Sequence, residues 1–167
     1  MPAATPLPRG PSILTLYDAA DLLTAPGCSV CRYAAEVSDR YLRWFALEGH
    51  SQPDTITRMC SCIGPCARHT RQLMSQPGAA VRMTAVYRYV VTAARDRLAS
   101  GADRLATCPA CDHDDTAAGR ALDTLIEGLA DPATMYRCQE LGGVCLPHLA
   151  AAAKLGRRQQ IGWLTET

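Results

Sequence analysis

The sequence has little lysine and few aromatic residues. Lys154 is the only lysine, so arginine carries the basic charge, and aromatic residues make up 5% of the chain. The 17 basic and 16 acidic side chains leave a formal net charge of +1. Phosphate backbones bind clustered, uncompensated cations, and single strands stack on aromatic rings. This composition therefore argues against a nucleic-acid partner.

Long apolar runs are missing as well. The stretch 79–94 is interrupted by Arg82 and Arg88, and no stretch reaches the roughly 18 apolar residues of a membrane-spanning helix. The N-terminal segment "MPAATPLPRGPS" lacks the basic region and apolar core of a secretory signal. We therefore expect a cytoplasmic protein that does not contact a membrane.

Familiar catalytic motifs are also absent. The sequence contains no glycine-rich phosphate loop, no H-E-x-x-H, no nucleophile elbow and no Cys-x-x-Cys-His haem motif. It gives no catalytic residues, and we favour a function other than catalysis. What it does contain is cysteine, with nine residues. In a reducing compartment, an odd number of cysteines indicates metal ligands or redox thiols rather than a disulfide framework.

Four ligand-type residues occur twice at almost constant separation. The Cys-x-x-Cys pairs "CSVC" at 28–31 and "CPAC" at 108–111 are 80 residues apart. The Cys-x-x-His segments "CARH" at 66–69 and "CLPH" at 145–148 are 79 residues apart. A chance match of both pairs at both distances is very improbable, so the sequence indicates a duplicated unit of about 50 residues.

The spacing of these residues suits zinc, which binds four thiolate or imidazole ligands at tetrahedral angles. Two ligands separated by two residues lie on one face of a helical turn and supply one edge of the tetrahedron. Joining the two edges of each repeat predicts two structural Cys₃His zinc sites. The predicted ligands are Cys28, Cys31, Cys66 and His69 at the first site, and Cys108, Cys111, Cys145 and His148 at the second. Because Cys₃His sets also hold iron–sulfur clusters, such a cluster is the alternative cofactor.

The remaining cysteines leave the first site ambiguous. Cys60 and Cys62 crowd Cys66 in "MCSCIGPCARH", so either is an alternative ligand there. Cys138 aligns with Cys60 in the other repeat, which suggests either an auxiliary thiol near the metal or a half-buried helix residue. His113, among the carboxylates of "CDHDD", is interpreted as part of a solvated first helical turn.

The apolar pattern predicts an all-α protein of two pseudo-repeated three-helix units, each closed by its own Cys₃His site, with a connecting helix between them. The predicted N-caps are Ser12, Asp54 and Asp131. A stripe from Met83 to Leu98 marks the connecting helix, whose end we expect to be exposed. The predicted segments are a proline-rich tail and short leading helix at 1–26, the first repeat at 27–76, the connecting helix at 77–106, the second repeat at 107–156 and a tail at 157–167.

The pattern resembles a largely uncharacterised bacterial family of helical proteins with a duplicated unit. In that family a Cys-x-x-Cys pair, a long helix, an Asp-Pro turn and a Gly-x-Cys-x-x-His segment occur twice. The resemblance covers about residues 27–156, and the first repeat departs from it by lacking the Asp-Pro pair. It implies no activity. The second repeat carries it best, through Cys108, Pro109, Cys111, Asp131, Pro132, Gly143, Cys145 and His148.

Closed four-ligand sites leave no position for a substrate. The sequence therefore favours a zinc-binding helical protein that acts as a protein-interaction or accessory module, with a protein as its partner. Two alternatives remain open. One is an iron–sulfur or thiol redox protein, and the other is an accessory enzyme in which one metal site exchanges a ligand for substrate.

Overall fold

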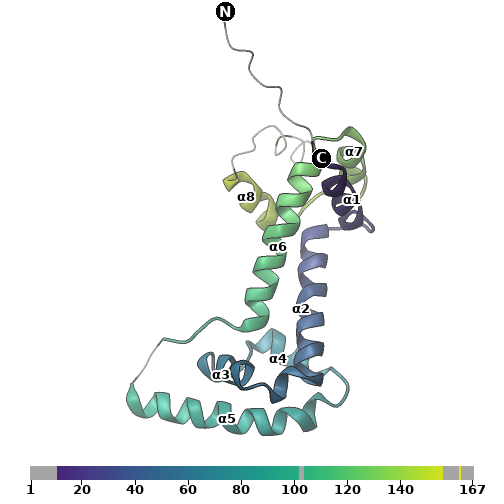
Figure 1. Ribbon diagram of the computed structural model, residues 1–167. Coiled ribbons are helices and arrows are strands. Elements are labelled where there is room, and N and C mark those ends of the chain that lie inside the picture. The colour runs from purple at the N-terminus through teal and green to yellow at the C-terminus, as the bar shows by residue number, and fades with distance from the viewer. Residues whose placement is uncertain (1–10, 102–103, 156–161, 163–167) are drawn as a thin grey trace, which may run out of the picture. The chain divides into compact units, whose positions relative to one another are not determined.

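The computed structural model describes residues 11–101, 104–155 and 162. Within these ranges the chain is helical and has no strand, as the sequence predicts (Figure 1). The predicted tail 157–167 lies outside the described residues, apart from Gly162. The helices are α1 (Ile13–Leu22), α2 (Ser29–Leu47), the 3-10 helix η1 (Gly49–Ser51), α3 (Pro53–Ser61), α4 (Ala67–Met74), α5 (Ala79–Ser100), α6 (Pro109–Gly128), α7 (Pro132–Glu140) and α8 (Leu146–Lys154).

The chain divides into two compact units that do not follow the predicted repeats 27–76 and 107–156. The central unit is the continuous segment Ala34–Ala117. The terminal unit combines Met1–Tyr33 with Ala118–Thr167. Each predicted repeat therefore contributes to both units, and so do α2 and α6.

The core of the terminal unit joins the start of α2 to the second half of α6. Val30 packs there with Leu125 and Ile126, all of them fully buried. α1 contacts α7, and it also approaches α6 closely. A Cβ atom on Gly128 would lie 2.6 Å from the Cβ of Ala19, so this helix crossing requires glycine.

The core of the central unit is built by α2, α3, α4 and α5. Phe45 of α2, Met59 of α3 and Leu73 of α4 are almost completely buried. α5 lies against α3 (Figure 1) and contributes Met83, Val86 and Val90 to this core. The far end of α5 is exposed as predicted, because Leu98 is 84% accessible.

The caps of the short helices correct one prediction. Ser12 and Asp131 cap α1 and α7, and each accepts a hydrogen bond from the N–H three residues further on. Asp54 does not cap α3, because Gln52 is the N-cap residue and Pro53 occupies the first position. Proline is preorganised for that position, where its missing N–H leaves no hydrogen bond unmade. Pro53 therefore corresponds to Pro132, at a shift of 79 residues.

The same shift continues along both short helices. The buried residue of α3 that matches Cys138 is Met59 rather than Cys60, and Met59 and Cys138 are each 1% exposed. Their carbonyl groups accept the N–H of Gly64 at 2.8 Å and of Gly143 at 2.9 Å, closing the same turn after each helix. Both glycines have positive φ, as this type of helix end requires. This turn leads the chain into each Cys-x-x-His segment.

Candidate metal centres

The eight predicted ligands form two clusters, but their grouping differs from the prediction. The terminal cluster consists of Cys28, Cys31, Cys145 and His148, and the central cluster consists of Cys66, His69, Cys108 and Cys111. Each cluster takes its Cys-x-x-Cys pair from one predicted repeat and its Cys-x-x-His segment from the other. The prediction that each repeat closes its own site was therefore wrong. Each cluster instead lies within one compact unit.

All four ligand segments have the same local structure. The first ligand directly precedes a helix, and the second is the third residue of that helix. Cys66 and Cys145 are the N-caps of α4 and α8, while Cys28 and Cys108 precede α2 and α6. Two helix N-termini thus meet at each cluster. Their first N–H groups, which have no carbonyl partner within the helix, and their macrodipoles favour the negative charge of thiolates.

The ligand atoms of the terminal cluster are spaced as the corners of a small tetrahedron. His148 Nδ1 lies 3.4 Å from Cys28 Sγ, 3.4 Å from Cys31 Sγ and 3.2 Å from Cys145 Sγ. The sulfur atoms of Cys31 and Cys145 are 3.5 Å apart. A zinc ion with bonds of about 2.3 Å to sulfur and 2.0–2.1 Å to nitrogen gives edges of about 3.6–3.8 Å. The cluster matches these edges to within a few tenths of an ångström.

The central cluster has nearly the same geometry. His69 Nδ1 lies 3.4 Å from Cys66 Sγ, 3.5 Å from Cys108 Sγ and 3.4 Å from Cys111 Sγ. The sulfur atoms of Cys66 and Cys111 are 3.7 Å apart. All nine cysteines of the chain are free thiols, so these contacts are not disulfides. Both histidines therefore direct the same nitrogen atom at three sulfur atoms.

The protonation behaviour of the thiols also fits a cation. Burial and hydrogen bonding to Cys145 raise the pKa of Cys31 to about 12. Burial alone would raise the pKa of Cys28 too, but backbone hydrogen bonds from Cys145 and Cys31 lower it to about 6. In the central cluster, burial and hydrogen bonding to Cys66 raise the pKa of Cys111 to about 12. Each cluster therefore accommodates one thiolate and opposes the next unless a cation neutralises them.

His69 of the central cluster has a carboxylate behind its ring. Its Nε2 lies 3.2 Å from Asp114 Oδ2, although it is not aligned for a hydrogen bond in this geometry. Arg68 forms an ion pair with the same carboxylate oxygen. Burial and the Arg68 guanidinium lower the pKa of His69, which favours the neutral imidazole that binds metals. A carboxylate at Nε2 keeps the proton on that nitrogen and leaves Nδ1 free for the metal.

Asp114 is a functional residue that the sequence interpretation missed. The acidic residues after Cys111 were expected to form a solvated turn, yet Asp114 is only 8% exposed. One signal was available, because Asp114 follows Cys111 by three residues and so lies on the same helix face. The equivalent position of the terminal cluster is Ala34, and the equivalent of Arg68 is Pro147. The terminal cluster thus lacks both charged neighbours.

The three surplus cysteines lie outside both clusters. Cys62, proposed as an alternative ligand, is buried and donates its S–H to the Met59 carbonyl at 3.4 Å. Cys60 does not replace a ligand either. Burial raises the pKa of Cys60, and burial raises that of Cys138 to about 11. These thiols are therefore protonated near neutral pH.

His113 is not the solvated residue that the sequence suggested. Its ring stacks on Tyr41 with centroids 4.2 Å apart, which ties the start of α6 to α2. Next to it, Arg58 of α3 donates to Asp112 at 3.3 Å. These contacts hold the first turn of α6, and with it Cys108 and Cys111, against the core of the central unit.

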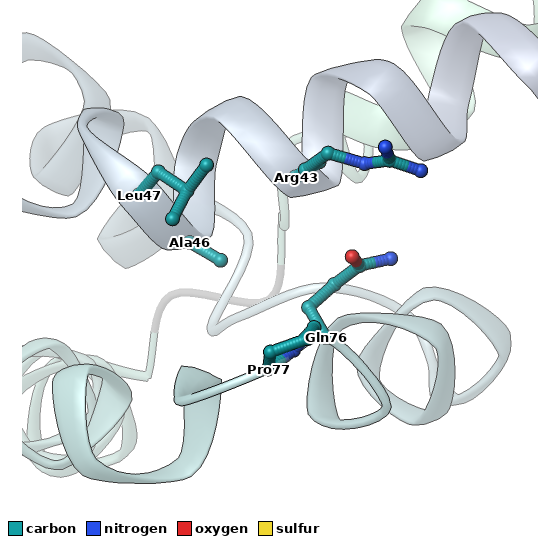
Figure 2. Close-up of a pocket in the computed structure, with 5 residues that line it drawn as sticks. All are labelled: Arg43, Ala46, Leu47, Gln76 and Pro77. Carbon is teal, nitrogen blue, oxygen red and sulfur yellow. The ribbon is translucent and has the colours of Figure 1, made fainter.

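A cleft of the central unit lies between α2 and the segment that precedes α5 (Figure 2). Arg43 and Gln76 face each other across it, with Ala46, Leu47 and Pro77 as apolar walls. Both polar groups are already engaged, since Arg43 and Gln76 each donate to Asp39 at 2.9 Å. The cleft therefore offers mainly apolar surface.

None of the described helices combines the length and apolar character needed to cross a membrane. Comparison of the chain with protein-family models, with curated proteins and with solved structures gives no match. The case for function therefore depends on the two clusters.

Proposed function

We propose that this chain is a cytoplasmic zinc protein with two structural Cys₃His sites and that it works as an interaction or accessory module for another protein. The observation that carries the proposal is the closure of four ligand atoms around one centre in each cluster, all within 4.8 Å of one another. Four protein ligands complete the tetrahedral shell of zinc, so no position is left for a substrate. We also propose that the chain belongs to the bacterial family that its repeated motif resembles.

The spacing of the ligands supports a single ion over an iron–sulfur cluster. A cluster distributes its thiolates over different iron atoms, which places them further apart than the ligands of one ion. The S–S contacts of 3.5 and 3.7 Å match edges of a tetrahedron around one ion. Thiolate and imidazole ligands together in a tetrahedron are typical of zinc.

Purified protein tests this directly. We expect two zinc ions per chain by native mass spectrometry, no absorption in the visible range, and X-ray absorption at the zinc edge that fits three sulfur atoms and one nitrogen per ion. Visible absorption with acid-labile sulfide would establish the iron–sulfur alternative instead. Binding of one ion or none would refute the two-site proposal.

The exposed face of α1 supports a protein partner. Ile13, Leu14 and Tyr17 are 73%, 74% and 69% accessible, and they lie on adjacent positions of one helix face. A partner isolated by crosslinking in cells would be purified and its affinity for the chain measured. We expect Leu14→Glu to weaken this binding, whereas Val81→Glu on the exposed side of α5 serves as the matched control. Equal affinities for both variants would exclude the α1 face as the docking surface.

A further inference from the structure

We propose that the terminal cluster is an oxidation site, at which peroxide joins Cys31 to Cys145 in a disulfide and the terminal zinc is released while the central zinc stays bound. The inference rests on the proposed zinc function and extends it to a chemical modification of one site. The supporting observation is that the two clusters have nearly the same ligand geometry but differ in how well they are protected from an oxidant.

The terminal cluster is the more accessible of the two. Cys31 is exposed, and none of its three companions is fully buried. In the central cluster, His69 is completely buried and Cys108 is 8% exposed. A small oxidant therefore reaches a terminal sulfur atom without any opening of the fold.

The central cluster is also protected by charge. The Asp114 carboxylate and its Arg68 partner lie behind His69, and this support holds the ring on its ligand position. Ala34, three residues after Cys31, and Pro147, directly before His148, stand at the equivalent positions and supply no such group. Among the described residues His148 therefore has no counterpart of the Asp114 and Arg68 pair, and we expect its cluster to release metal more readily once a thiolate is lost.

The reacting atoms are already close. The sulfur atoms of Cys31 and Cys145 are 3.5 Å apart, at the starts of α2 and α8. The matching central pair, Cys66 and Cys111, is 3.7 Å apart, so proximity alone does not separate the sites. The two sites differ instead in the exposure of their sulfur atoms and in the charged support behind His69.

The chemistry balances with hydrogen peroxide as the oxidant. The Cys31 thiolate attacks one peroxide oxygen, the O–O bond breaks, and the leaving hydroxide takes up a proton to become water. The Cys145 thiolate then attacks the resulting sulfenic sulfur of Cys31, an S–S bond forms, and a second hydroxide leaves as water. Two thiolates lose two electrons in total, and peroxide is reduced to two water molecules.

The product keeps the chain cross-linked. The disulfide joins α2 to α8, the same two helices that the terminal zinc joins, while two of the four ligands disappear. The oxidised terminal unit therefore exchanges one cross-link for another. A dithiol reductant together with zinc should restore the original site.

The experiment uses the full zinc-loaded chain, in which the metal content is counted before any oxidant is added. Hydrogen peroxide is then titrated while a chromophoric chelator reports released zinc, and peptide mapping identifies the disulfides. We expect release of one of the two ions, together with a disulfide between Cys31 and Cys145. A disulfide between Cys66 and Cys111 formed first, or simultaneous release of both ions, would overturn the proposal. A chain without zinc at the start would instead refute the proposed function.

Two matched variants sharpen the result. Cys31→His removes the exposed thiol but keeps a ligand, so we expect the early release of zinc to be lost. Cys60→Ser removes a thiol that lies outside both clusters and should leave the early release unchanged. If Cys31→His does not bind two ions, the peptide map of the unmodified chain still decides between the sites.

Discussion

The exchange of ligand segments between the two predicted repeats can be tested by counting metal ions in paired variants. Cys31→Ala with Cys145→Ala removes two ligands of the terminal cluster and none of the central cluster. We therefore expect this variant to keep one zinc ion per chain. If each repeat closed its own site, the same pair of changes would damage both sites and leave no ion.

A second pair of changes gives the opposite result. Cys31→Ala with Cys66→Ala removes one ligand from each observed cluster, so both sites should be impaired. With sites closed within each repeat, both changes would fall in the first site and leave the second intact. Each double variant is therefore the control for the other, because both carry two alanine substitutions of cysteine ligands.

The size of the effect follows from the number of ligands lost. Structural zinc sites bind with about 10–16 kcal/mol in small domains at neutral pH. Losing two of four ligands removes roughly half of that free energy, about 5–8 kcal/mol, which is a loss of roughly 10⁴–10⁶-fold in affinity. A chelator of intermediate affinity then strips a damaged site and spares an intact one. The reasoning fails if the variant lacking Cys31 and Cys145 retains no zinc while the variant lacking Cys31 and Cys66 retains one ion.

Three further predictions concern the surroundings of the clusters. Asp114→Asn should weaken zinc at the central cluster by about 10–100-fold and leave the terminal affinity unchanged, as measured by chelator competition; equal weakening of both would contradict the role of Asp114. Gly128→Ala should lower the free energy of unfolding by about 1–3 kcal/mol, because the new Cβ would lie 2.6 Å from Ala19. Its control is Gly119→Ala on the same helix, where the new Cβ meets nothing within 4 Å and should not destabilise the protein. The pKa of Cys31 and of Cys111 is raised to about 12, so both thiols hold protons at pH 7 that zinc must displace. Zinc affinity should therefore rise by about tenfold per pH unit for each proton released. Calorimetry in two buffers of different ionisation enthalpy counts those protons, and a count of zero would refute the assignment.

The sequence was sufficient to identify the ligands but not to pair them. The spacing within "CPAC" or "CLPH" fixes one edge of a tetrahedron, because it depends only on one helical turn. Which two edges meet depends on packing between residues about 95 positions apart, such as Val30 against Leu125 and Ile126. The cap of α3 was missed for a simpler reason. Asp54 is a better capping residue than Gln52, but Pro53 fixes the first position of the helix and places Asp54 inside it.

The observed pairing of ligand segments also makes the two sites differ in the length of chain that each closes into a loop. His69 and Cys108 are 39 residues apart, whereas Cys31 and Cys145 are 114 residues apart, and the shorter loop lies within the longer one. Closing the longer loop costs about 1 kcal/mol more in chain entropy by the logarithmic dependence on loop length. The central unit is one continuous segment that holds its complete cluster, while the terminal unit must join both ends of the chain. Loop entropy alone therefore favours closure of the central cluster before the terminal one. The site that loop entropy closes last is also the exposed one, so loss of a metal ion there would leave the central loop closed.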